Sequence, residues 1–245
     1  MIKKHIPNFI TSLNVLCGSI AVVFIMKGVL TTAVLLIMLA ALFDFLDGLS
    51  ARMLKAYSPM GKELDSLADM ISFGLAPGLI MYKLLETSHF NENVGPDLQS
   101  FLSPGELLIV GSAFLIPVFS ALRLAKFNID ERQTSSFIGL PTPANALFIS
   151  SLALIREHCS YPAIDTLLLS TPVLIGITIL FSWLLVAEIP MFSMKFKSLG
   201  WQNNKVQYIF LCCAVLLMAN LQLYGIAATV LLFIAISVFL SLAKK

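Results

Sequence analysis

Long apolar stretches alternate with short polar segments along the whole chain. Each stretch is roughly 17–25 residues long, which suits an α-helix that crosses the hydrocarbon core of a bilayer. The fifth stretch is short, and polar residues interrupt the seventh. The pattern predicts about eight transmembrane helices, which cover residues 9–28, 31–53, 61–85, 106–127, 141–157, 166–188, 205–221 and 224–243.

The composition supports a membrane protein. Of the 245 residues, 58% are hydrophobic and 12% are charged, whereas a soluble domain has about 25% charged residues. The net charge of +2 is too small to suggest binding to nucleic acids. We therefore expect an all-α, polytopic membrane helix bundle. Residues 1–245 are expected to form a single integral membrane domain without a soluble domain.

The basic residues predict how the chain is oriented, because short cytoplasmic loops are enriched in Lys and Arg. With the N-terminus inside, the predicted outer loops contain Lys27, Lys83 and Arg156. The inner set is larger: Lys3, Lys4, Arg52, Lys55, Lys62, Arg123, Lys126, Arg132, Lys195, Lys197, Lys205, Lys244 and Lys245. We expect a protein of the inner (cytoplasmic) membrane with both termini in the cytoplasm.

Four aspartates interrupt the apolar pattern within residues 42–74. Asp44 and Asp47 are spaced i, i+3 on the second predicted helix, so they share one face of it. Asp65 and Asp69 are spaced i, i+4 on the third helix and also share a face. Since a short loop joins these antiparallel helices, the two pairs are expected to face each other.

The depths of the two pairs also match. Asp44 precedes Arg52 by eight residues and Asp69 follows Gly61 by eight residues, which corresponds to about 12 Å along each helix. Arg52 and Gly61 flank the cytoplasmic loop between the helices. The four carboxylates are therefore expected to converge near the cytoplasmic side of the membrane, which is also where we expect the active site.

Negative charges at this depth need compensation. Each intramembrane aspartate costs about 2.5–3.5 kcal/mol on the insertion scale, and mutual repulsion adds to this cost. Protons or cations must offset it. Clustered carboxylate oxygens suit hard divalent ions such as Mg²⁺ or Mn²⁺, which complete their shells with water and substrate phosphate. The sequence therefore predicts a metal site at Asp44, Asp47, Asp65 and Asp69.

Small residues lie beside the acids. Gly48, Ala51 and Gly61 leave space for a bulky, phosphate-bearing ligand, and Arg52 at the rim is a candidate to hold a phosphate. The alternative for the small residues is structural, because Gly and Ala also let membrane helices pack closely.

The acids and small residues follow the pattern D-x2-D-G-x2-A-R-x8-G-x3-D-x3-D. This pattern resembles the signature of the CDP-alcohol phosphotransferase family, whose members transfer a phosphatidyl or similar group from a CDP-linked donor to an alcohol and release CMP. The resemblance implies that the four aspartates bind divalent metal and that Asp69 is the general base. It also implies a homodimer and a CDP-donor site formed by Asp47, Gly48, Ala51, Arg52, Gly61 and Asp65.

Four flanking segments narrow the resemblance to the membrane-embedded branch that uses CDP-diacylglycerol as donor and L-serine as acceptor. They are "IPNFITSLNVLCGSIA", "ALRLAKFN", "FIGLPTPANA" and "SWLLVAEIPMFSMKFK". The resemblance implies a catalytic six-helix core at about residues 6–197. The last helix pair, about residues 205–243, is expected to be an extension of that core, and membrane lipids are expected to surround the bundle.

The acceptor-binding residues are less sharply defined by the sequence. Arg123, Lys126 and Asn128 lie at the cytoplasmic end of the fourth predicted helix. Arg123 and Lys126 are candidates for binding the serine carboxylate or a donor phosphate, but basic residues there also anchor helices at the lipid surface. Asn128 is a candidate substrate ligand or simply a helix end. The "GLPTPAN" segment is expected to bend, because Gly and Pro oppose a regular helix, and either walls the acceptor pocket or forms a structural turn.

Three other functions compete with this hypothesis. The first is another activity of the same family, in which the acceptor alcohol is glycerol 3-phosphate or inositol phosphate. Such an acceptor carries a phosphate and would need a pocket with more basic residues. A proton- or metal-coupled transporter is the second, because intramembrane acids also serve ion pathways. The acids here cluster toward one side, which opposes that function. The third is a non-catalytic scaffold.

Overall fold

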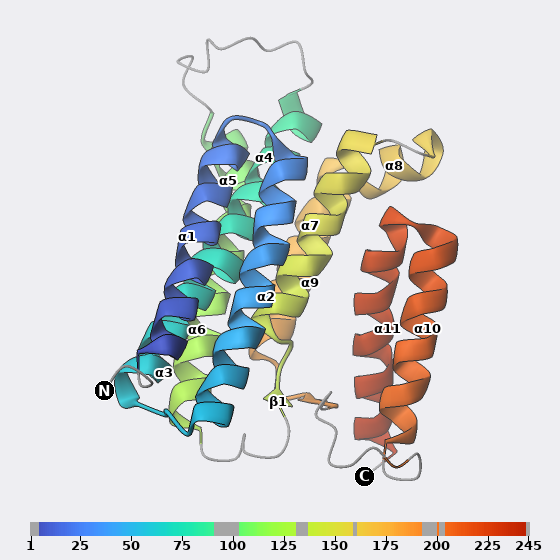
Figure 1. Ribbon diagram of the computed structural model, residues 1–245. Coiled ribbons are helices and arrows are strands. Elements are labelled where there is room, and N and C mark those ends of the chain that lie inside the picture. Colours follow the sequence, from blue (N-terminus) through green and yellow to red (C-terminus); the bar gives the residue numbers. More distant parts are fainter. Residues whose placement is uncertain are drawn as a thin grey trace.

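The computed structural model describes residues 5–90, 103–130, 137–158, 161–192, 200 and 204–243 (Figure 1). The described residues are almost entirely helical, so the predicted all-α class is confirmed. Two short strands, β1 (Phe137–Ile138) and β2 (Pro190–Met191), pair antiparallel in this part of the chain. Lys3, Lys4, Arg132, Lys195, Lys197, Lys244 and Lys245 lie outside the described residues.

Helices make up most of the part of the chain that the structure describes. Three of them, α3, η2 and α4, form one continuous rod in which η2 is a π-helical segment. In chain order, the elements are α1 (Ile6–Met26), α2 (Leu30–Leu54), α3 (Pro59–Asp69), η2 (Met70–Leu75), α4 (Ala76–Phe90), α5 (Pro104–Gly111), η3 (Ser112–Phe114), α6 (Leu115–Ile129), α7 (Thr142–His158), α8 (Pro162–Leu168), α9 (Thr171–Val186), α10 (Lys205–Leu221) and α11 (Leu223–Leu242).

The lengths and compositions of the helices identify a multi-pass membrane protein. Among the described residues, five helical rods are long and apolar enough to cross a bilayer, and the bent pair α8–α9, with a 57° break, brings the number to six. Helices α7 and α10 have 17 residues each and are shorter than these rods. Seven predicted ranges lie mainly on single helical rods, whereas the sixth, 166–188, crosses the break between α8 and α9. The total of eight spans stays a prediction.

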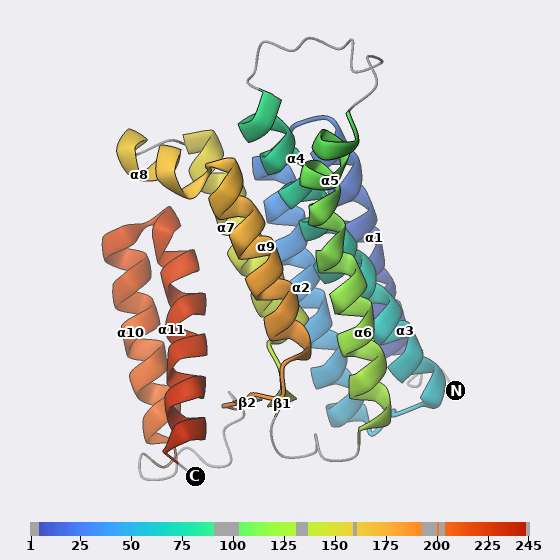
Figure 2. The ribbon, with the colours of Figure 1, turned by 180° about the vertical axis from the view of Figure 1, so that it is seen from behind.

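The helices form a main bundle with a hairpin beside it. Helices α1, α2, α4, α6, α7 and α9 run roughly along one direction, and the α10–α11 hairpin stands next to α7 (Figures 1 and 2). Helix α11 packs against α7, while α6 packs against α9 and against η2. The division into a core at 6–197 and an added pair at 205–243 stays a prediction.

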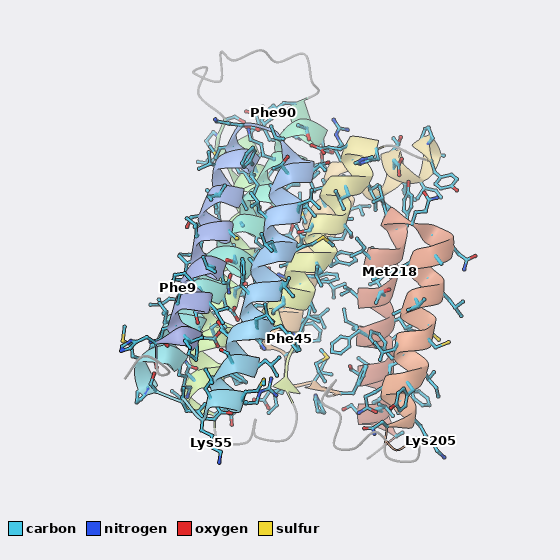
Figure 3. The ribbon with its side chains drawn as sticks, in the orientation of Figure 1. Phe9, Phe45, Lys55, Phe90, Lys205 and Met218 are labelled. Atoms are coloured by element: carbon cyan, nitrogen blue, oxygen red, sulfur yellow. The ribbon has the colours of Figure 1, made fainter. Side chains whose placement is uncertain are left out.

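The basic residues separate to the two ends of the bundle. Lys55 and Lys205 lie at one end, whereas Phe90 lies at the other (Figure 3). At the end opposite Lys55, Lys83 and Arg156 line a pocket between the ends of α2, α4 and α7. Lys83 and Arg156, from the predicted outer set, therefore lie at the opposite end of the bundle from Lys55 and Lys205, which belong to the predicted inner set.

Close contact between α1 and η2 fixes the helices that carry the acids. A Cβ atom added at Gly18 would lie 2.9 Å from Ser72 Cα, so only glycine fits there. The hydroxyl of Ser72 donates a hydrogen bond of 3.1 Å to the carbonyl oxygen of Asn14. The result is that η2, directly after Asp69, is held against the middle of α1.

The predicted bend before α7 is present and is docked against the end of α9. Gly139 has φ +81°, in the left-handed region that glycine adopts without strain. Its N–H donates to Ile189 O at 2.9 Å, and Leu140 N–H donates to Leu184 O at 2.9 Å. These bonds fix where α7 begins and therefore place Thr142, its first residue, inside the bundle.

Candidate active site

Helices α2 and α3 bring three of the four predicted acids together. Single carboxylate oxygens of Asp44, Asp47 and Asp65 all lie within 4.8 Å of one another. The turn between the helices explains the approach: Lys55 ends α2 with φ 52°, and Ser58 caps α3 by accepting a 3.0 Å hydrogen bond from Gly61 N–H. The chain thus reverses over a few residues.

Asp69 lies next to this three-acid group but not within it. It is the last residue of α3, at the start of the π-helical segment, and only 8% of it is exposed. The Asp44 side chain interacts with those of both Asp65 and Asp69. Asp44 therefore connects the three-acid group to the proposed base.

The chemistry of these carboxylates fits a bound cation. Asp47 Oδ2 and Asp69 Oδ1 are buried and have no hydrogen-bond partner among the described residues. A buried acceptor without a partner costs about 1–3 kcal/mol or more, and several adjacent carboxylates repel one another. A divalent ion with oxygen ligands relieves both costs. Asp44, Asp47 and Asp65 are the residues placed to hold it.

A pocket of about 210 Å³ opens beside the acids at the α2–α3 end of the bundle. Five of the six residues predicted for the CDP-donor site line it, and Arg52 does not. The Arg52 side chain is exposed, and its Nε donates to Gly48 O at 3.0 Å. The lining residues are Pro7, Asn8, Thr11, Asp47, Gly48, Ala51, Ala56, Tyr57, Ser58, Gly61, Lys62 and Asp65.

Helix α1 supplies a wall of this pocket to which the sequence assigned no role in binding. Thr11, 3% exposed, lies beside the Asp47 carboxylate. Asn8 Oδ1 lies 3.0 Å from the position that a Cβ atom at Gly61 would take. The sequence signal is the occurrence of polar residues on an otherwise apolar helix. For Asn8, ligand binding and helix capping are equally good explanations of that signal.

Arg123 points into the bundle instead of the membrane surface. It is 7% exposed, and its Nη1 donates a 3.2 Å hydrogen bond to Thr142 Oγ1 on α7. The guanidinium carbon lies 5.7 Å from the centre of the Phe127 ring. Arg123 also interacts electrostatically with Asp69 and Asp44. The Arg123 guanidinium on α6 is thus directed toward the acids.

Lys126 and Asn128, the other two acceptor candidates, have protein partners near the surface. Lys126 Nζ forms a 3.1 Å ion pair with Glu188 Oε1, and both side chains are substantially exposed. The side-chain amide of Asn128 donates to Ser66 Oγ at 3.0 Å, and the backbone carbonyl oxygen of Asn128 accepts a 2.8 Å hydrogen bond from Lys62 Nζ. Asn128 thereby ties the end of α6 to α3.

Comparison with known proteins finds relatives that share one name. CDP-diacylglycerol–serine O-phosphatidyltransferase of Bacillus subtilis is 36% identical over 141 residues, which are 57% of this chain and 70% of that protein. The Helicobacter pylori (strain 26695) protein of the same name is 33% identical over 175 residues, 70% of this chain and 67% of its own.

An archaeal relative carries a related name. Archaetidylserine synthase of Methanothermobacter thermautotrophicus is 34% identical over 152 residues, which are 61% of this chain and 58% of that protein. The matched part is thus less than two thirds of the archaeal protein. The sequence model of CDP-alcohol phosphatidyltransferases matches residues 4–243, and the chain therefore belongs to the CDP-alcohol phosphatidyltransferase family.

Proposed function

We propose that this protein is a CDP-diacylglycerol–serine O-phosphatidyltransferase, or phosphatidylserine synthase, of phospholipid biosynthesis. It transfers the phosphatidyl group of CDP-diacylglycerol to the hydroxyl of L-serine and releases CMP. The observation that carries the proposal is the pocket in which Asp47 and Asp65 meet Gly48, Ala51 and Gly61. The names of the relatives support serine as the acceptor.

The donor binds where small side chains border the acids. Gly48, Ala51 and Gly61 leave room for the CDP group, and Arg52, bonded to Gly48 O, attracts its phosphates. Asp44, Asp47, Asp65 and Asp69 would hold Mg²⁺ or Mn²⁺, and the first three have the carboxylate oxygens that lie closest together. Such an ion neutralises phosphate oxygens and stabilises charge on the leaving CMP.

Asp69 acts as the general base on the acceptor. In the reaction, the serine oxygen forms a bond to phosphorus while the bond from phosphorus to the CMP oxygen breaks. The hydroxyl proton passes to the Asp69 carboxylate, whose Oδ1 has no hydrogen-bond partner among the described residues. General-base help of this kind contributes about 10²–10⁴-fold to the rate.

The buried cation of α6 is suited to the carboxylate of the acceptor. Arg123 retains an Nε without a hydrogen-bond partner, and a guanidinium binds a carboxylate with parallel hydrogen bonds. Lys126, paired with exposed Glu188, and Asn128, bonded to Ser66, contribute by shaping the entrance near Arg123.

The position of the site also suggests how the enzyme sits in its membrane. The acids lie on α2 and α3, which flank the turn that contains Lys55. Lys55 and Lys205 lie at the same end of the bundle (Figure 3), and the basic residues favour that end as the cytoplasmic one. The nucleotide and free serine then approach from the cytoplasm, while the donor tails stay among membrane lipids of the inner membrane. The family resemblance supports a homodimer.

An acceptor panel tests the proposal. Purified protein in detergent receives CDP-diacylglycerol, Mn²⁺ or Mg²⁺, and one acceptor at a time: L-serine, glycerol 3-phosphate or inositol phosphate. CMP release and phosphatidylserine formation with serine are expected. CMP release with glycerol 3-phosphate but not with serine would make the protein a different member of its family, and metal uptake into vesicles without CMP release would support a transporter.

A further inference from the structure

An asparagine inside the bundle has no explanation in the packing. Asn145 lies on α7 and is 0% exposed, yet neither Nδ2 nor Oδ1 has a hydrogen-bond partner among the described residues. Leaving a buried amide without partners costs about 1–3 kcal/mol for each unsatisfied group. Buried polar side chains are almost always hydrogen-bonded, so Asn145 is a residue that calls for a ligand.

Asn145 lies on the same face of α7 as Thr142, the hydrogen-bond partner of Arg123. Thr142 and Asn145 are spaced i, i+3 on α7, which places their side chains on one face about one turn apart. Thr142 Oγ1 accepts the hydrogen bond from Arg123 Nη1. The amide of Asn145 therefore lies about 4.5 Å deeper along α7 than the point where the guanidinium is anchored.

Helix α6, which carries Arg123, also has a buried polar side chain without a hydrogen-bond partner among the described residues. Ser120 precedes Arg123 by three residues, is 0% exposed and has no hydrogen-bond partner for Oγ among the described residues. Its Cβ lies 3.2 Å from the position that a Cβ atom at Gly74 would take. Ser120 thus faces η2, the segment that begins directly after Asp69, and both α6 and α7 pack against η2.

If Asn145 and Ser120 only held the helices together, their side chains would form hydrogen bonds between helices. Polar side chains that hold membrane helices together donate and accept hydrogen bonds across the interface. The structure has such pairs, for example between Ser72 Oγ and Asn14 O. Asn145 and Ser120 form none among the described residues, and the Arg123 guanidinium keeps an unpartnered Nε. Donors and acceptors left open on two helices that both pack against η2 suit a small zwitterion.

We propose that Asn145 positions the acceptor by binding the α-ammonium group of serine. Its carboxamide oxygen accepts a hydrogen bond from the ammonium, while Arg123 holds the carboxylate and the serine hydroxyl is directed toward Asp69. This assignment rests on the proposed function. It makes Asn145 a specificity residue, because glycerol 3-phosphate has no ammonium group and leaves the buried amide without a partner.

Steady-state kinetics of Asn145→Ala test the assignment. The variant is compared with the wild-type protein using L-serine and 3-hydroxypropionate, which keeps the hydroxyl and carboxylate of serine but lacks the ammonium. We expect the KM for serine to rise about 10–100-fold, as for a lost hydrogen bond to a charged group, while the KM for CDP-diacylglycerol stays unchanged. The preference for serine over 3-hydroxypropionate is expected to fall by a similar factor.

Two further variants make the test specific. Asn220→Ala on α10 is the matched control, because Asn220 is exposed and its amide bonds only a carbonyl of its own helix in the described structure. It is expected to leave both KM values unchanged. Asn145→Asp keeps an acceptor oxygen and is expected to retain most of the preference for serine, so it carries the test even if the alanine variant does not fold.

The outcomes separate this inference from the proposed function. Three results overturn the role of Asn145 alone. They are an unchanged KM for serine in Asn145→Ala, equal changes in the KM values for serine and CDP-diacylglycerol in that variant, and loss of the preference for serine over 3-hydroxypropionate in Asn145→Asp. A wild-type protein that releases no CMP with serine overturns the proposed function, and the inference with it.

Discussion

Arg123 on α6 donates a 3.2 Å hydrogen bond to Thr142 on α7, and this bond holds a buried guanidinium among helices that also carry carboxylates. Asp69 and Asp44 interact with the same guanidinium. A charge in this position is costly to bury without partners. The structure therefore distinguishes Arg123 from the exposed Lys126, although both lie on the last turns of one helix.

This difference predicts unequal effects of two substitutions. Arg123→Ala should raise the KM for serine by about 10–100-fold, because it removes a charge-assisted bond to the carboxylate. Lys126→Ala should change it less than about threefold, since an exposed ion pair contributes only about 0–1 kcal/mol. Steady-state CMP release measures both. Equal losses in the two variants contradict the assignment of Arg123.

Replacing the proposed base should remove turnover without removing the fold. Asn in place of Asp69 has nearly the same shape but does not accept the hydroxyl proton, so CMP release should fall by about 10²–10⁴-fold. Glu63→Gln, at an exposed acid on the same helix, is the control and should retain activity. Near-normal turnover in Asp69→Asn, with thermal stability in detergent unchanged, would exclude Asp69 as the base.

The acids also predict how activity depends on divalent metal. Asp47→Ala removes one of the three carboxylates within 4.8 Å of one another. The metal concentration at half-maximal activity should rise at least tenfold, because a hard cation loses an oxygen ligand. Titration of the chelated protein with Mn²⁺ or Mg²⁺ measures this shift. Full activity of the wild-type protein in excess chelator is the result that would refute a metal role.

Much of this site could be read from the sequence because the acids occur where charge is costly. Asp44, Asp47 and Asp65 are spaced so that helical periodicity alone places them on facing surfaces, and the structure brings them together. The helix ranges follow from apolar length in the same way. Asp69 ends α3 beside these three acids, where a π-helical segment begins, and its part in binding metal stays a prediction.

The remaining parts of the site depend on tertiary packing that no local pattern encodes. Thr11 reaches Asp47 only because α1 lies against the α2–α3 turn. Asn145 faces the interior because the bend at Gly139 docks on the end of α9 and sets where α7 starts. The pairing of Lys126 with Glu188 joins residues 62 positions apart. Single-sequence periodicity carries no information on such distant contacts.

The contact between α1 and η2 predicts a strong effect of a small substitution. Gly18→Ala places a methyl group 2.9 Å from Ser72 Cα, and overpacking of this kind costs about 1–3 kcal/mol. The temperature at which the detergent-solubilised protein loses activity should fall. Gly176→Ala is the control, because nothing described lies within 4 Å of its added Cβ, and it should be neutral or slightly stabilising. Equal stability of the two variants would contradict the close crossing.

The most direct test of the central claim follows both products of one reaction. Purified protein is incubated with CDP-diacylglycerol and isotopically labelled L-serine, and mass spectrometry quantifies CMP and labelled phosphatidylserine with and without a divalent ion. We predict that the two products form in equal amounts and only when Mn²⁺ or Mg²⁺ is present, and that both fall by about 10²–10⁴-fold in Asp69→Asn. Labelled lipid formed equally well in excess chelator, or no labelled lipid under any condition, would contradict the account.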